Sequence, residues 1–200
     1  SRLHGSLPST VQSLSKMFSF SVSSNSLTGT IPEAFADLTM LSIIDISGNS
    51  LSGTLPSMVN IDRLYLLSVQ NNRLTSAGDD FLNGLFQKPK KDLAILDASY
   101  NEFTGSIDQR IFEAPSLRLI NLANNCFSGR VVTQSICAAR TLEVLVMSQL
   151  TSSYECRDNI WSNTALDNVF SGFIDRTQVW GEIPTCLYQL DSISTIIMSG

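Results

Sequence analysis

Histidine is almost absent from this sequence, which has only His4 among its 200 residues. Hydrolases of the Ser-His-Asp and Cys-His types need an imidazole beside their nucleophile. His4 stands near one end of the chain, apart from every cysteine, so neither arrangement can be built in its body. The sequence therefore predicts a protein that is not an enzyme and that holds no cofactor or metal.

Basic residues and long apolar runs are also scarce. Lysine and arginine number 13 against 18 aspartates and glutamates, a net charge of −5, so no basic face is available for a nucleic acid. The one dense basic cluster, Lys88, Lys90 and Lys91, is interpreted as a solvated loop. No apolar run reaches the roughly 18 residues of a membrane span, and the first residues lack a signal-peptide core. Any membrane association is expected only through segments outside this chain.

Cysteine occurs only in the second half of the chain. The four residues are Cys126, Cys137, Cys156 and Cys186. None of their spacings gives the C-x-x-C pair of a structural zinc site. An even number of clustered cysteines favours disulfides, which persist in oxidising environments. The sequence therefore predicts an extracellular or cell-surface location.

A repeat fills most of the chain. Five segments read apolar-x-x-apolar-x-apolar-x-x-Asn, and they end at Asn25, Asn49, Asn72, Asn101 and Asn125. The alternation of apolar residues predicts a short strand with one face inward. Parallel stacking of such strands buries a core that no single repeat could build. The five asparagines are expected to form a buried ladder, because their amides can satisfy backbone groups in neighbouring coils.

A second signature follows the asparagines. Leu27–Pro32 and Leu51–Pro56 read L-x-G-x-I/L-P, Val179–Pro184 is similar, and residues 103–107 and 127–131 lack only the proline. This pattern resembles the plant-type leucine-rich repeat (LRR) of receptor-like ectodomains and polygalacturonase-inhibiting proteins, over nearly the whole chain. The resemblance implies an α/β solenoid, a right-handed superhelix with a parallel β-sheet on its concave face. About seven short strands are expected, the first near Met17–Val22 and the last near Ile193–Met198.

Residues 1–200 are interpreted as a single solenoid segment, cut mid-repeat at both ends and therefore part of a longer protein. Two stretches break the period. Residues 74–92 form a small insertion, interpreted as a short helix and a charged turn that decorate the surface. Residues 150–178 form a larger insertion. Four cysteines allow three connectivities, and their places on stacked coils favour Cys126–Cys156, which would staple the larger insertion, and Cys137–Cys186.

The solvent-facing strand positions form columns across the coils, and most carry small polar side chains. Longer side chains gather beside the larger insertion, which also supplies aromatic and arginine residues of the kind that anchor interfaces. The predicted partner-binding residues are Asp97, Tyr100, Asn121, Asn124, Val146, Gln149, Tyr154 and Arg157. The alternative is that the aromatic residues of the insertion only pack it onto the solenoid. A further column, Ile43, Leu66, Ile95, Leu119 and Val144, is interpreted as half-buried scaffold.

Two classes of function fit these features. Asp45 and Asp97 lie two coils apart, roughly 10 Å at the usual strand spacing, which exceeds the separation of a glycosidase carboxylate pair. The favoured function is a non-catalytic protein-recognition module of a receptor-like, extracellular or cell-surface protein, with a macromolecular partner on the concave face. The alternative is a structural, surface-coat or cell-wall protein whose polar face contacts polysaccharide or another ordered surface.

Overall fold

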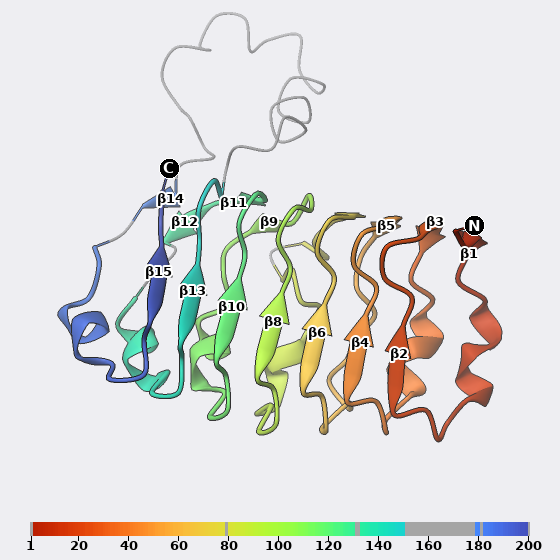
Figure 1. Cartoon of the computed structure of the whole chain (residues 1–200), viewed down its shortest axis with the longest axis horizontal. Helices are drawn as coiled ribbons and strands as arrows, with labels where there is room; N and C mark the ends of the chain where they lie inside the picture. Colours follow the sequence, from red (N-terminus) through yellow and green to blue (C-terminus); the bar gives the residue numbers. More distant parts are fainter. Residues whose placement is uncertain (1, 79, 131–132, 151–178, 181, 200) are drawn as a thin grey trace, which may run out of the picture.

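The central element is a parallel sheet of seven strands, each three residues long. A computed structural model describes residues 2–78, 80–130, 133–150, 179–180 and 182–199. In chain order the strands are β2 (Ser19–Ser21), β4 (Ile43–Asp45), β6 (Leu66–Ser68), β8 (Ile95–Asp97), β10 (Leu119–Asn121), β13 (Val144–Val146) and β15 (Thr195–Ile197). They stand side by side in this order (Figure 1). The predicted number of strands, and the places of the first and the last, are confirmed.

The register of this sheet brings equivalent repeat positions together. Ile44 lies opposite Phe20 on one side and Leu67 on the other. The central residues of the five inner strands form one inward column and are at most 1% exposed: Ile44, Leu67, Leu96, Ile120 and Leu145. Strand β13 pairs directly with β15, so the sheet is continuous although residues 151–178 separate these strands in the sequence.

A second set of strands follows the asparagines and was not predicted. The strands β1 (His4–Ser6), β3 (Ser26–Thr30), β5 (Ser50–Gly53) and β7 (Arg73–Leu74) form a four-stranded parallel sheet. Two further pairs join β9 (Thr104–Gly105) to β11 (Cys126–Phe127), and β12 (Gly129–Arg130) to β14 (Val179–Trp180). The glycines of the L-x-G motif have positive φ, 76° at Gly53, where an added Cβ would lie 3.0 Å from Thr30 Cγ2. Glycine is therefore required for both its conformation and its size.

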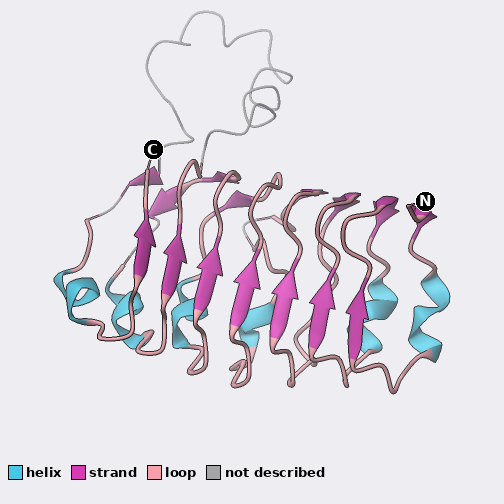
Figure 2. Ribbon diagram, viewed as in Figure 1, coloured by secondary structure: helices cyan, strands magenta, loops and turns pink. Residues whose placement is uncertain are grey.

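The return segments on the convex side contain short 3₁₀ helices of three to five residues (Figure 2). They are η1 (Ser9–Ser13), η2 (Glu33–Asp37), η3 (Leu85–Gln87), η4 (Gln109–Glu113), η5 (Gln134–Ala138) and η7 (Thr185–Gln189). Pro8, Pro32 and Pro184 immediately precede three of them in extended conformation. Proline fits there because its fixed φ suits the turn and the first helical residues need no further donor.

Helix η4 begins with a carboxylate cap. The Oδ1 atom of Asp108 accepts a hydrogen bond from the backbone N–H of Arg110 at 3.0 Å, and the Arg110 guanidinium also contacts both carboxylate oxygens. Burial of Asp108 acts to raise its pKa, but the side-chain and backbone hydrogen bonds and the charge of Arg110 together bring the pKa below its usual value.

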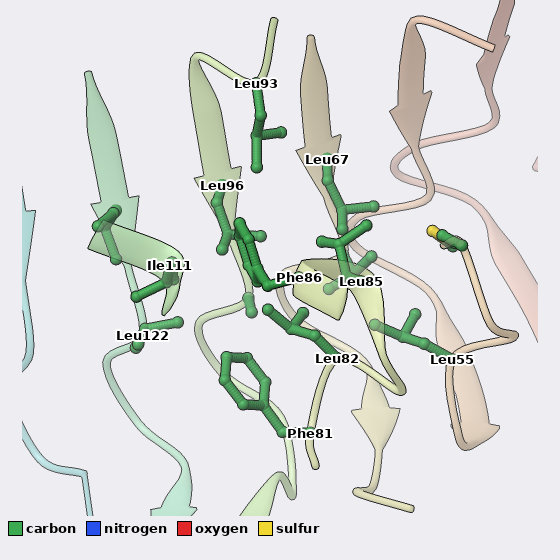
Figure 3. Packing of buried hydrophobic residues seen from close by; sticks show 14 of the residues in the cluster. Leu55, Leu67, Phe81, Leu82, Leu85, Phe86, Leu93, Leu96, Ile111 and Leu122 are labelled. Atoms are coloured by element: carbon green, nitrogen blue, oxygen red, sulfur yellow. The ribbon is translucent and has the colours of Figure 1, made fainter. Parts of the chain in front are cut away.

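The interpretation of residues 74–92 as surface decoration was wrong. Phe81, Leu82, Leu85 and Phe86 are between 1% and 6% exposed and belong to the main core. Figure 3 shows them between the residues of neighbouring coils, including Leu55, Leu67 and Leu96. The extra length of this repeat therefore places apolar side chains inside the solenoid, where the neighbouring return segment from Pro56 to Arg63 has no 3₁₀ helix.

Lys90 also differs from its predicted place in a solvated loop. Lys88 and Lys91 are exposed as expected, but Lys90 is 0% exposed. Its Nζ atom donates to the backbone carbonyl oxygens of Met58, Val59 and Ile61 at 3.0–3.1 Å. Burial lowers the pKa of this amino group, Asp62 opposes the shift and Lys88 reinforces it. The ammonium group of Lys90 therefore supplies hydrogen-bond donors to the carbonyl oxygens of a return segment that has no 3₁₀ helix.

Candidate recognition surface

The concave face is built from the strand side chains that point away from the core. The first aspartate on it, Asp45, is held by its own strand end. Its Oδ1 atom accepts a hydrogen bond from the Ser47 backbone N–H at 3.1 Å and from the Ser47 hydroxyl at 2.6 Å. The sequence Asp-x-Ser thus fixes the carboxylate orientation without any contact to another coil.

The same arrangement recurs at Asp97, two strands away. Ser99 donates its backbone N–H and its hydroxyl to Asp97 Oδ1 at 3.0 and 2.7 Å. Asn121, on the next strand, donates Nδ2 to Asp97 Oδ2 at 3.2 Å and accepts the Ala123 N–H at 3.3 Å. The structure therefore brings the predicted residues Asp97 and Asn121 into direct contact, and part of their hydrogen-bonding capacity is used within the protein.

The residue before each ladder asparagine has a left-handed backbone conformation. These residues are Ser24, Gly48, Asn71, Tyr100 and Asn124, and Gln149 has the same conformation at the equivalent position before Leu150; φ lies between 51° and 64° in all six. Glycine and asparagine are common in this region, serine and glutamine are less common, and a bulky aromatic residue there is an outlier. The Tyr100 side chain is nevertheless 58% exposed. Packing of its ring in the core therefore does not compensate for the unfavourable backbone conformation.

The remaining predicted residues divide into described and undescribed ones. Val146 is half-buried at the end of β13, Asn124 is half-buried and Gln149 is exposed. Tyr154 and Arg157 lie outside the described residues. The structure therefore places Asp97, Tyr100, Asn121, Asn124, Val146 and Gln149 on the consecutive coils four to six, where they were expected.

The asparagine ladder ties this face to the second set of strands. Each carboxamide oxygen accepts a backbone N–H of the preceding coil at 2.9–3.1 Å. Asn125, for example, accepts from Phe103 and donates to carbonyl oxygens of Ala98 and Leu122. Asn101 and Asn125 are buried at 4% and 0% exposure.

Full burial of the ladder was predicted, but Asn25, Asn49 and Asn72 are only half-buried. The buried members stand in the coils where Phe103 and Phe127 replace the leucine of the L-x-G motif. Both rings pack edge-to-face against Phe81, with centroids 5.5 and 4.8 Å apart.

Disulfides link the C-terminal coils. Cys137 on η5 and Cys186 on η7 form a disulfide with Cα atoms 5.6 Å apart and a sequence separation of 49. Cys126 is also disulfide-bonded, and its expected partner, Cys156, lies outside the described residues. Such crosslinks persist in oxidising environments, which agrees with an extracellular or cell-surface location.

The described parts of the chain contain no group of three or more histidine, cysteine, aspartate or glutamate residues that could hold a metal ion. Among the same residues, no helix has the length and apolar character needed to cross a membrane.

Comparison with known proteins agrees with this geometry. The family model described as Leucine Rich Repeat matches residues 17–38 and 40–60, which form the first two coils of the seven-stranded sheet. The chain has the fold of a leucine-rich-repeat solenoid. No curated protein sequence matches it.

Solved structures extend the likeness beyond the two matched repeats. The solenoid is similar to the LRR ectodomain of the plant membrane receptor kinase GASSHO1/SCHENGEN3 from Arabidopsis thaliana, with a TM-score of 0.74, 22% identity and 100% of this chain covered. It is similar to the plant peptide hormone receptor RGFR1, with a TM-score of 0.66, 24% identity and 100% coverage. The ectodomain of the receptor kinase SOBIR1 from Arabidopsis thaliana gives a TM-score of 0.57 and 26% identity over 66% of this chain and 69% of that chain.

The solenoid spans 21% of the GASSHO1/SCHENGEN3 chain and 31% of the RGFR1 chain. The first of these structures is a complex with Casparian strip integrity factor 2, and the second is a complex with RGF2.

Sequence reasoning missed the clamps on Asp45 and Asp97, although the repeated Asp-x-Ser spacing at the strand ends could have revealed them.

Proposed function

We propose that the solenoid is a non-catalytic recognition module of an extracellular or cell-surface LRR protein, and that it binds a protein or peptide partner on its concave face. The proposal rests on Tyr100, which combines a left-handed backbone with an exposed aromatic side chain. Strained backbone at a residue whose side chain is exposed is often retained for function rather than for stability. Tyrosine is also enriched among the residues that dominate binding energies.

The position of Tyr100 on coil four agrees with a binding region over coils four to six. Asn124 and Gln149 occupy the equivalent positions of the next two coils. The polar contact between Asp97 and Asn121 joins the residues three positions before Tyr100 and Asn124. The larger insertion begins directly after this region and contains Tyr154 and Arg157, which we include in the proposed surface. The peptide complexes of the structural neighbours support a peptide or protein partner.

The alternative is a structural or coat protein whose small polar side chains contact polysaccharide. The hydroxyl-rich N-terminal part of the concave face, with Ser19 and Ser21 exposed on β2, supports this second candidate. The two proposals differ in the part of the face that they need: the peptide proposal rests on Tyr100, and the polysaccharide proposal rests on the exposed serines of β2.

A variant at Tyr100 separates binding from folding. Tyr100→Asn introduces the residue that adopts the same left-handed conformation in both neighbouring coils, so the fold should be unchanged or slightly stabilised. The wild-type chain is first used to select binders from a phage-displayed library of 12-residue peptides. Tyr100→Asn should weaken the selected peptides by more than about 1 kcal/mol, roughly fivefold in Kd.

The matched control is the double variant Ser19→Ala and Ser21→Ala at the other end of the face, which should bind like the wild type. Equal losses in both variants would mean that the whole face is used. Loss only in the serine variant, or binding of cell-wall oligosaccharides with no peptide binder selected, would refute the proposal in favour of the alternative.

A further inference from the structure

Five aliphatic side chains form a continuous row on the concave face. Ile43, Leu66, Ile95, Leu119 and Val144 begin five consecutive strands, and each lies directly opposite the next. All five are half-buried, so each presents part of its side chain to solvent. At a strand spacing of about 4.8 Å the row is roughly 19 Å long. In Figure 1 no other element of the described chain lies in front of these strands.

A polar row runs beside the aliphatic row, two residues further along each strand. It contains Asp45, Ser68, Asp97 and Asn121, which are also aligned by the register. The clamps from Ser47 and Ser99 occupy one oxygen of each aspartate. Within the described residues Oδ2 of Asp45 accepts no hydrogen bond, and Oδ2 of Asp97 accepts only the one from Asn121.

These two aspartates carry the unbalanced charge of the face. The seven strands contain no other charged residue, and Arg118 and Glu143, which directly precede β10 and β13, form an ion pair at 3.5 Å. Neither aspartate makes an ion pair with a described residue. A partner that covers the aliphatic row would therefore bury two carboxylates, and this is favourable only if it supplies positive groups to them.

We propose that Asp45 and Asp97 determine specificity and select a peptide segment that carries two cationic side chains at matching spacing, with aliphatic side chains on the row beside them. This inference rests on the proposed recognition function and adds the chemistry of its partner. Charge complementarity across an interface suppresses partners of the wrong charge, and a guanidinium or ammonium group can donate a charge-assisted hydrogen bond to the Oδ2 atom that the clamp leaves accessible.

The register sets the spacing of the two cations. Asp45 and Asp97 are two strands apart, about 9.6 Å. A segment in polyproline II conformation returns to the same face every three residues, about 9.3 Å. A peptide that crosses the strands in this conformation would therefore place residues i and i+3 over the two aspartates, and residues i+1 and i+4 are left to contact the aliphatic row.

A synthetic 12-residue peptide with the sequence Arg-Leu-Pro repeated four times tests the inference on the 200-residue chain. A second peptide of the same composition, with all four arginines at one end, controls for net charge. The spaced peptide should bind at least about fivefold more tightly than the permuted one in isothermal titration at low salt.

The aspartates can be neutralised without disturbing the fold. Asn121 occupies the same column and accepts the equivalent turn hydrogen bond, so Asn at positions 45 and 97 should keep the Ser47 and Ser99 clamps through Oδ1. At position 97 only the hydrogen bond from Asn121 Nδ2 is lost. The double variant Asp45→Asn and Asp97→Asn should bind the spaced peptide at least about tenfold more weakly, which is the loss of one charge-assisted interaction or more. Asp37→Asn with Glu113→Gln, a pair exposed on the convex side, makes the same change in net charge and should bind like the wild type.

The outcomes separate this inference from the proposed function. Equal binding of the spaced and permuted peptides, or equal losses in the two double variants, would overturn it. Failure of both arginine peptides, with library-selected peptides still sensitive to Tyr100→Asn, would overturn it and leave the recognition function standing. Failure of every library peptide would remove the recognition function itself.

Discussion

Replacing Lys90 with methionine tests whether the buried ammonium group supports the solenoid. Methionine keeps most of the length of the side chain and its apolar character but removes the donors. The variant would leave the carbonyl oxygens of Met58, Val59 and Ile61 without the Nζ hydrogen bonds that they accept in the wild type. The hydrogen bonds to Met58 and Ile61 are buried, and the one to Val59 is partly buried, so water can replace only the last.

The magnitude follows from these two buried acceptors. An unsatisfied buried acceptor costs about 1–3 kcal/mol. Relief from burying a charge offsets part of this cost, so the net loss in free energy of unfolding should be about 2–4 kcal/mol. In a domain of this size each kcal/mol shifts Tm by about 2–4 °C. Lys90→Met should therefore lower Tm by roughly 10 °C.

Thermal and urea unfolding, followed by circular dichroism under non-reducing conditions, would measure the change. Lys91→Met is the matched control, because Lys91 is the adjacent exposed lysine and its variant should change Tm by less than about 2 °C. Equal and small shifts in the two variants would refute the reasoning. They would mean that water or a rearranged loop satisfies the three carbonyl oxygens.

The pH dependence gives a second measurement. Burial lowers the pKa of Lys90 in the folded protein, so the folded state loses the lysine proton at a lower pH than the unfolded chain. Between those two pKa values the unfolded state binds more protons, and stability rises with pH. The stability difference between the wild type and Lys90→Met should therefore widen as pH increases through the folded-state pKa of Lys90 towards 10.5. A difference that narrows over this window would contradict the burial of a charged amine.

Three further predictions concern the scaffold. Asn125→Ala should destabilise the protein by about 2–4 kcal/mol in urea unfolding, because several buried backbone groups lose their partner, and a loss below about 1 kcal/mol would contradict the role of the ladder. Replacing Cys137 and Cys186 with serine should cost about 4 kcal/mol, as expected for a loop of this length; an unchanged urea midpoint, or free thiols at these positions in non-reducing peptide mapping, would contradict the crosslink. Asp108→Asn should cost at most about 1 kcal/mol because its pair with Arg110 is exposed. Since the pKa of Asp108 is lowered, its contribution should be present above the unfolded-state pKa of 3.8 and lost as pH falls through the folded-state pKa; a variant that matches the wild type at pH 7 would exclude it.

The sheet could be predicted because its determinants are local and repeated. Each strand is marked by its apolar alternation, and each turn by an asparagine whose hydrogen bonds reach only the adjacent coil. Ile44, Leu67 and their equivalents therefore fell into register once the period was known. The second set of strands was missed because L-x-G-x-I was interpreted as a turn signature, although its alternation is also that of a strand.

The insertion at residues 74–92 was misinterpreted because it lies outside the period. Phe81, Leu82, Leu85 and Phe86 have paired apolar spacing that is compatible with either a surface helix or a core plug. These residues lie in the core because the return segment of the preceding coil has no 3₁₀ helix. The sequence of the insertion itself contains no information about that segment. The same is true of Lys90, whose burial depends on carbonyl groups about thirty residues earlier in the chain.

The candidate site was only partly predictable for a related reason. The columns on the concave face followed from the register, so Asp97 and Asn121 were placed together. The left-handed backbone at Tyr100 and the serine clamps are properties of the strand ends in three dimensions. The aliphatic row was recognised in the sequence, but its relation to two clamped carboxylates required the paired strands.

The pairing of β13 with β15 has a consequence for how the protein folds. Paired residues of the other neighbouring strands are 23 to 29 residues apart in the sequence, whereas Ser194 reaches Glu143 across 51 residues. Each doubling of a closed loop in the unfolded chain costs only about 0.6 kcal/mol. The C-terminal coil therefore docks against β13 at little thermodynamic cost, but it has the highest contact order of the sheet and should be the slowest to join a growing solenoid. The Cys137–Cys186 disulfide joins the two coils that meet in this step. Its formation would therefore hold the C-terminal coil in its docked position.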